Sequence, residues 1–195
     1  MQYSTDLYVK SSQEWLDAVM NDFDSFLQDH ADCERKASAM AMSLIAKYPD
    51  REVIMKPLIA LAIEELEHFD QVISLMQERE ISLPAKMEKD FYVTELIKLT
   101  HGGTPESRFL DRLLLGSVIE CRGWERFKMV SEALENTELK KFYKNLWTSE
   151  AKHGNLFVEL ALNYFEKEKV YKRLHELIAA EENILIALPV RAALH

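Results

Sequence analysis

The stretch Glu65-Leu66-Glu67-His68 carries a carboxylate and an imidazole three residues apart, and Glu150-Ala151-Lys152-His153 repeats that spacing later in the chain. A further glutamate precedes each stretch at a similar distance, Glu34 by 31 residues and Glu120 by 30. One Glu on a helix and a Glu-x-x-His turn on the next, present twice, is the ligand pattern of helical bundles that hold two metal ions. The repeat therefore predicts four helices around a metal pair.

The position of the turns supports this interpretation independently of the ligands. Two residues on antiparallel neighbouring helices lie at one height when the turn falls midway between them. The midpoint of Glu34 and Glu65 falls at Pro49-Asp50. The midpoint of the second pair falls at Glu135, beside Asn136, which can cap a helix. Both predicted hairpins therefore bring their ligands together.

The composition indicates one all-α domain over residues 1–195. The chain has 195 residues, 48% of them hydrophobic, which is enough for a substantial core. It contains only 5 Gly and 5 Pro, and its apolar residues recur at spacings of three and four. No stretch is long or polar enough to divide two domains. We therefore expect a four-helix bundle with extra flanking helices.

Capping residues and turns place the helices approximately. Pro57 leaves two alternatives for the second long helix: it either starts near Lys56 or contains the proline as a kink. The expected helices are residues 11–47, with or without a break; a second through Met76; a short one within 88–99; 104–131, opened by Thr104-Pro105; 136–167; and 170–187 on the outside.

Burial gives the physical reason to expect metal. Glu120 shares an apolar stripe with Phe109 and Phe127, and Glu150 lies among similar residues on the following helix. Ionised carboxylates in an apolar interior need a compensating charge, and no interior Lys or Arg is obvious in the sequence. Two divalent ions would supply it, and carboxylate and imidazole ligands suit iron or manganese. The predicted ligands are Glu34, Glu65, His68, Glu120, Glu150 and His153.

Other residues near these positions have more than one interpretation. With 23 Glu and 6 His, chance alone gives about 0.7 Glu-x-x-His pairs, so the repeat and its turns carry the information rather than one match. His30 lies one turn before Glu34 and either supports it or is an ordinary core or surface histidine, the interpretation we favour. Gly116 and Gly123 flank Glu120 by one turn and either permit close helix packing or clear space for a substrate.

The sequence does not support a secreted protein, a membrane-spanning protein or a fold held by disulfides. The first ten residues lack a basic segment followed by an apolar run, and no window approaches 18 apolar residues. We therefore expect a soluble cytoplasmic protein that does not interact with membranes. Cys33 and Cys121 are too few for a disulfide framework, and both are expected to be reduced and buried as small apolar groups.

Longer segments of the chain carry a resemblance that is more specific than the metal ligands alone. They are Asp29-His30-Ala31-Asp32-Cys33-Glu34-Arg35-Lys36-Ala37, residues 64–72, Asp111-Arg112-Leu113-Leu114, Ile119-Glu120-Cys121-Arg122, Glu125-Arg126-Phe127, Phe142-Tyr143 and Ser149-Glu150-Ala151-Lys152-His153. Together they resemble a known family, the tRNA 2-methylthio-N6-isopentenyladenosine hydroxylases. The resemblance extends from about residue 5 to about residue 188.

The resemblance implies a ferritin-like, non-haem di-iron monooxygenase that hydroxylates the isopentenyl side chain of a modified adenosine in tRNA. It implies two iron ions on the six residues named above, with Glu65 and Glu150 as candidate bridging ligands. Oxygen would be the co-substrate. No flavin or nicotinamide fingerprint occurs, so a separate electron-transfer partner is expected to supply electrons.

The net charge of −9 opposes a nucleic-acid substrate on average, although two divalent ions would bring the formal total to about −5. Local basic patches would then have to bind tRNA. The candidates are Lys140, Lys141, Lys144 and Lys152; Arg122, Arg126 and Lys128; and Lys167, Lys169, Lys172 and Arg173. Two other functions remain open: a ferritin-like iron-handling or peroxide-reducing protein, and a helical interaction module with a vestigial site.

Overall fold

The computed structural model describes residues 5–100 and 102–195. These residues form eight α-helices and contain no strand, which confirms the predicted all-α class. They fall into two compact units, each described by itself. The α2–α3 unit comprises residues 13–89 and 190–194, and the α5–α8 unit comprises the remaining described residues. The prediction of a single domain over residues 1–195 stays a prediction.

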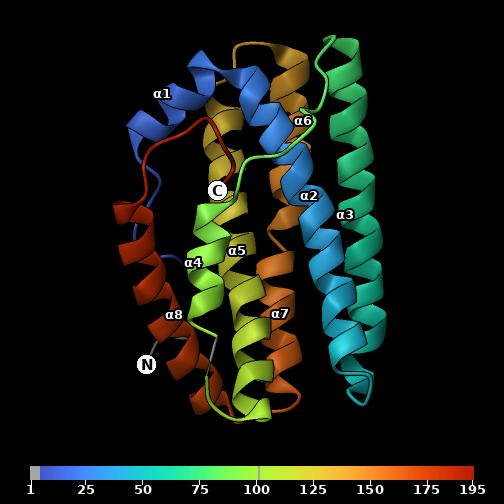
Figure 1. Ribbon diagram of the computed structural model, residues 1–195, viewed down its shortest axis with the longest axis vertical. Helices are drawn as coiled ribbons and strands as arrows, with labels where there is room; N and C mark the ends of the chain where they lie inside the picture. Colours follow the sequence, from blue (N-terminus) through green and yellow to red (C-terminus); the bar gives the residue numbers. More distant parts are fainter. Residues whose placement is uncertain (1–4, 101) are drawn as a thin grey trace. The chain divides into compact units, whose positions relative to one another are not determined.

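The α2–α3 unit is built on one long helical hairpin. Its helices are α1 (Gln13–Asn21), α2 (Phe23–Lys47) and α3 (Glu52–Glu78). α2 and α3 pack side by side along their length and are joined by the short turn around Pro49 (Figure 1). The expected first helix is broken at Asp22, whose carboxylate accepts a hydrogen bond from the Ser25 N–H at 3.2 Å and so caps α2.

Pro57 lies inside α3 rather than at its start. The helix begins at Glu52 and continues through the proline, so the alternative start near Lys56 is wrong. Because proline has no N–H, α3 lacks one backbone hydrogen bond in this turn. Ile54 and Leu58 on either side are fully buried, and their packing holds the helix together across that position.

The α5–α8 unit contains the other five helices. They are α4 (Phe91–Lys98), α5 (Pro105–Ala133), α6 (Thr137–Glu150), α7 (His153–Leu162) and α8 (Lys167–Ala187). α5 packs against α6, α7 and α8, while α4 lies against α8 (Figure 1). The expected caps are confirmed: Thr104 accepts from the Ser107 N–H at 3.2 Å and Asn136 accepts from the Leu139 N–H at 2.9 Å.

The long helix expected over residues 136–167 is wrong in two respects. It ends at Leu162, and it is interrupted between Glu150 and His153. At the interruption the Lys152 N–H bonds to the Ser149 carbonyl at 3.1 Å, three residues back, whereas the Ala151 N–H still bonds four residues back. This tighter turn separates the two halves of the second Glu-x-x-His stretch. Glu150 therefore ends one helix and His153 begins the next.

Candidate metal centre

The α2–α3 unit brings three predicted ligands together. Glu34 projects from α2, and Glu65 and His68 project from α3, one turn apart. The His68 Nδ1 atom lies 3.5 Å from the Glu65 Oε2 atom and 3.9 Å from the Glu34 Oε2 atom. Each of the three residues offers a ligand atom within 4.8 Å of the others. Two carboxylates and one imidazole thus form a compact triad.

His30 belongs to this triad's surroundings. Its Nε2 atom lies 2.6 Å from the Glu34 Oε1 atom, and its side chain is completely buried. The interpretation that His30 supports Glu34 is therefore the better one, although the sequence favoured an ordinary histidine. A buried imidazole at this distance fixes the orientation of the carboxylate, as partners of metal ligands commonly do.

The α5–α8 unit builds a second triad of the same composition. Glu120 comes from α5, Glu150 is the last residue of α6, and His153 is the first residue of α7. The His153 Nδ1 atom lies 2.8 Å from the Glu150 Oε2 atom and 3.8 Å from the Glu120 Oε2 atom. The break between α6 and α7 thus does not separate the two side chains, because His153 still lies beside Glu150.

The chemistry of both triads suits a metal ion. All six side chains are buried, with exposed fractions between 1% and 6%. Carboxylates gathered in such an interior repel one another unless a positive charge lies among them. Oxygen and imidazole nitrogen donors without thiolates match iron or manganese better than structural zinc. The residues in each unit therefore fit a carboxylate-rich metal site.

A pocket of about 390 Å³ adjoins the second triad within the α5–α8 unit. Glu150 lines it together with Trp124 and Gly154, and another part of its wall is formed by Thr5, Asp6, Leu7, Val9 and Lys10. Cys121 also lines it. Burial and the neighbouring Glu120 charge raise the pKa of the Cys121 thiol to about 11, despite hydrogen bonding to Thr5 and Ser117. The thiol therefore stays protonated near neutral pH, but Cys121 is half-buried in the pocket wall, whereas the sequence predicted a buried residue.

The two glycines that flank Glu120 serve different purposes. A Cβ atom on Gly116 would lie 2.9 Å from the ring of Phe157, so this glycine permits α5 and α7 to pack closely. A Cβ atom on Gly123 would meet no other described atom within 4 Å. Packing therefore explains Gly116, whereas open space beside Gly123 supports the alternative of room for a ligand.

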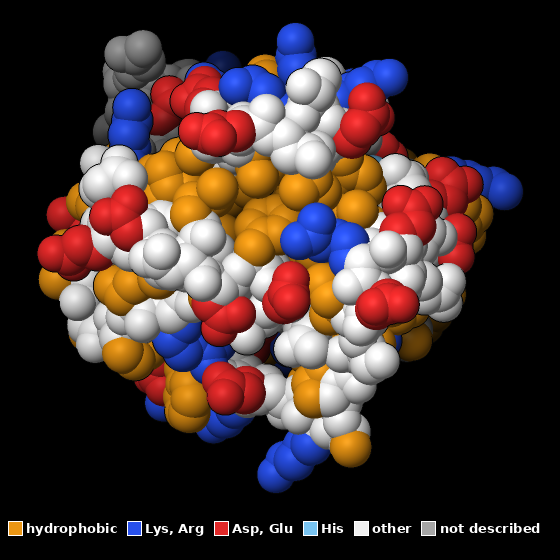
Figure 2. Space-filling model, turned by 90° about the horizontal axis from the view of Figure 1, so that it is seen from above, with side chains coloured by type: hydrophobic (Ala, Val, Ile, Leu, Met, Phe, Trp, Pro, Cys, Tyr) orange, Lys and Arg blue, Asp and Glu red, His pale blue; other side chains and the backbone are white. Residues whose placement is uncertain are grey.

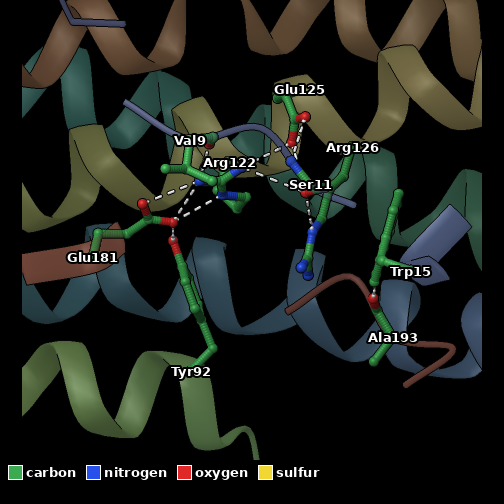
Figure 3. A network of polar contacts seen from close by, with 9 residues as sticks. All are labelled: Val9, Ser11, Trp15, Tyr92, Arg122, Glu125, Arg126, Glu181 and Ala193. Atoms are coloured by element: carbon green, nitrogen blue, oxygen red, sulfur yellow. Dashed lines mark hydrogen bonds and ion pairs between the residues drawn. The ribbon is translucent and has the colours of Figure 1, made fainter. Parts of the chain in front are cut away.

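Two arginines are buried in the α5–α8 unit, contrary to the expectation of an interior without cations. Arg122 is completely buried and binds Glu181 through its Nε and Nη2 atoms at 2.8 and 3.0 Å (Figure 3). Burial alone would lower the pKa of Arg122, but the hydrogen bonds and charge of Glu181 raise it above its ordinary value. Arg126 is 5% exposed. Neither arginine is available to phosphate, so both are removed from the candidate tRNA contacts.

The remaining basic candidates lie on helix surfaces. Lys140, Lys141 and Lys144 on α6 are exposed, and Lys152 follows them. Lys128 lies over the rings of Trp124 and Trp147, 5.5 and 5.8 Å from their centroids. On the face of the molecule in Figure 2, acidic and basic side chains are intermixed and apolar side chains lie among them. Local clusters rather than net charge would therefore have to attract RNA.

Two buried Glu₂His triads carried by helices define the class of protein: a ferritin-like, all-helical protein whose buried carboxylates and imidazoles suit metal ions. The family described as tRNA-(MS[2]IO[6]A)-hydroxylase (MiaE) matches residues 2–195. The chain belongs to this family, and the resemblance and enzyme class predicted from the sequence are confirmed. No helix in the described residues is long and apolar enough to cross a membrane.

Individual relatives agree with this assignment. The chain is 37% identical over 175 residues to the tRNA 2-(methylsulfanyl)-N(6)-isopentenyladenosine(37) hydroxylase of Pseudomonas putida, covering 90% of this chain and 83% of that protein. The hydroxylase of the same name from Salmonella typhimurium is 35% identical over 104 residues, covering 53% of this chain and 37% of that protein.

A solved structure confirms the predicted ferritin-like fold class. It is described as protein 43 with aldehyde deformylating oxygenase activity from Synechococcus. The match has a TM-score of 0.90 at 31% sequence identity and covers 98% of this chain and 93% of that chain.

Proposed function

We propose that this protein hydroxylates the isopentenyl group of 2-methylthio-N6-isopentenyladenosine in tRNA, using oxygen and two iron ions. This function was predicted from the sequence, and the family match and both named relatives support it. The observation that carries the proposal is the repeated triad: each unit buries two glutamates and one histidine within ligand distance of one another.

The proposed iron ligands are the six residues of the two triads. Glu34, Glu65 and His68 would contribute to one ion, and Glu120, Glu150 and His153 to the other, with Glu65 and Glu150 as proposed bridges. Support comes from the donor types and from their matched burial. His30 would hold Glu34 in place through the 2.6 Å contact between their side chains.

Bound iron would supply the redox chemistry that activates oxygen, which protein side chains cannot do themselves. In the overall reaction a C–H bond of the prenyl group becomes C–OH, one O₂ is consumed, and two electrons and two protons convert its second oxygen atom to water. The chain's own residues orient the ligands and exclude water. The pocket beside Glu150 gives a substrate group access to the proposed centre.

The remaining components belong to the proposal as well. Electrons would come from a separate protein or small-molecule donor, and the tRNA would carry the prenylated adenosine. We propose a cytoplasmic location because the proposed substrate is tRNA. Lys140, Lys141 and Lys144 on α6 would contact its phosphates, since they are exposed on the helix that ends at Glu150.

Comparison of tRNA from cells with and without this protein tests the function. Nucleoside mass spectrometry should find the hydroxylated nucleoside only when the protein is present, and the unhydroxylated prenyl nucleoside should accumulate without it. Identical nucleosides in both samples would contradict the proposal and favour an iron-handling role, which oxidation of added iron by the purified protein would then reveal.

A further inference from the structure

Residues 5–11, here called the N-terminal strap, form one wall of the pocket beside Glu150. Thr5, Asp6, Leu7, Val9 and Lys10 line this pocket. Trp124 of α5 and Ala151, Gly154 and Asn155 around the α6–α7 break line its other parts. A volume of about 390 Å³ lies within the range of small-molecule sites. The strap therefore contributes the aliphatic side chains Leu7 and Val9 to a pocket that also contains a proposed iron ligand.

The strap is held in place along its length by other parts of the α5–α8 unit. The Val9 carbonyl accepts from Arg122 Nη2 at 2.8 Å, and the Ser11 N–H and hydroxyl donate to Glu125 at 2.9 and 2.8 Å (Figure 3). The Arg126 Nε–H donates to the Ser11 hydroxyl at 2.9 Å. On one side of Leu7 the Tyr8 hydroxyl lies 2.7 Å from His175 Nδ1 on α8, and on the other side the Thr5 hydroxyl donates to Asn155 Oδ1 at 3.4 Å.

The composition of the wall indicates what it would accept. Leu7 and Val9 are half-buried and offer no side-chain hydrogen-bonding group, whereas Asp6, Lys10 and Asn155 on the rim are exposed and polar. A ligand with an apolar branched group and a polar heterocycle matches this division. A hydroxyl group placed against Leu7 and Val9 would lose its contact with water without gaining a partner there.

Resting on the proposed function, we propose that Leu7 and Val9 of the N-terminal strap set the specificity of the pocket for an N6-prenylated adenine. The wall contacts the unmodified prenyl group, excludes water from it, and binds the hydroxylated product less well. Product release is thereby favoured over renewed binding. An apolar pocket discriminates against an added hydroxyl by about a hundredfold at most, so the preference is measurable but moderate.

The test compares Leu7→Asn, which replaces an aliphatic side chain by a polar one of similar shape, with Leu83→Asn, the same change at an exposed position that does not line the pocket. Binding of N6-isopentenyladenosine and of its hydroxylated form is followed by tryptophan fluorescence, because Trp124 lines the pocket. The unaltered protein and Leu83→Asn should prefer the unhydroxylated nucleoside. Leu7→Asn should weaken its binding at least tenfold and reduce the preference, with iron content and melting temperature unchanged.

Kinetics with prenylated tRNA provide a second measurement on the same preparations. Leu7→Asn should raise KM for the tRNA by about the factor by which it weakens nucleoside binding, and kcat should change less, because the iron ligands are untouched. Equal nucleoside binding and equal KM in Leu7→Asn and the unaltered protein would overturn the proposal. If the unaltered protein binds the nucleoside but never hydroxylates it, the proposed function fails, while the binding comparison still decides the role of the strap.

Discussion

Glu120 and Glu150 come from different helices of one unit and both lie within 4 Å of the same imidazole nitrogen of His153. Because each would supply a charged ligand, Glu120→Ala or Glu150→Ala should greatly reduce the iron content from about two ions per chain. Metal analysis of the purified variants measures this loss of iron. Glu67→Ala is the matched control, since this glutamate is exposed and should leave the iron content unchanged. Full iron in both ligand variants would contradict the assignment.

Valine substitutions at Gly116 and at Gly123 separate the effects of helix packing from those of the pocket. Gly116→Val forces a side chain into the ring of Phe157 and should destabilise the protein by about 1–3 kcal/mol. Gly123→Val enters open space, so iron and stability should persist while tRNA hydroxylation falls sharply.

Thermal melting, iron content and product yield on one preparation of each variant distinguish these outcomes. Undiminished product from Gly123→Val would exclude a pocket role for that glycine. Joint loss of stability, iron and activity in the same variant would instead show that residue 123 is a packing position like residue 116.

The ligand residues could be predicted because chemistry and spacing coincide in them. A buried glutamate is costly, so its repetition at helical spacing beside histidine carries information. His30 could not be assigned, since a histidine one turn from a ligand is common by chance and only the 2.6 Å contact with Glu34 reveals its orientation. The buried Arg122 was missed because its partner Glu181 lies 59 residues away in sequence.

The pairing of Arg122 with Glu181 ties α5 to α8 in the buried interior of the α5–α8 unit. Both side chains are completely buried, and the Tyr92 hydroxyl of α4 also donates to Glu181 at 2.9 Å. Burial and the Glu181 charge raise the pKa of Tyr92 well above its ordinary value, so the phenol remains a donor. The packing of α4, α5 and α8 against one another thus depends on the Arg122–Glu181 ion pair.

Arg122→Met should therefore destabilise the protein by about 3–5 kcal/mol, because it leaves the Glu181 carboxylate buried without its cation. Urea unfolding measures the change. Arg173→Met is the control: Arg173 pairs with Asp111 and Glu176 but its side chain is 30% exposed, so solvent should compensate for much of that loss. Equal destabilisation by both substitutions would refute the argument from burial.

The starts of two helices followed from the sequence because a capping residue marked each of them. Thr104-Pro105 and Asn136 located the starts of α5 and α6 because their side chains bond to the first backbone N–H groups. The break at Ala151-Lys152 has no such signal: neither residue disfavours a helix, and the change is one of backbone hydrogen bonding alone. The end of α7 at Leu162 likewise precedes a segment without proline or glycine.

The chain as a whole carries a formal charge of −9, so binding of tRNA has to rely on local cations. Lys141→Glu with Lys144→Glu should weaken tRNA binding and reduce the slope of log K against log salt by about two, one for each phosphate that the lysines no longer neutralise. Iron content should not change. Binding titrations at several salt concentrations provide the slope.

Lys47→Glu with Lys56→Glu is the matched control, because it changes the net charge equally at exposed positions on α2 and α3. If this control weakens binding as much as the α6 substitutions do, net charge rather than the α6 surface governs the affinity, and the proposed tRNA contact is wrong.

Under the proposed function, iron, oxygen and a prenylated tRNA meet on this chain. Reduced, iron-loaded protein supplied with oxygen, an electron source and tRNA carrying the prenylated adenosine tests it in one reaction, analysed by nucleoside mass spectrometry. We predict that the prenylated nucleoside gains the mass of one oxygen atom, and that protein with Glu120→Ala or Glu150→Ala produces none of it. Oxidation of the iron with no change in the nucleoside would contradict the account.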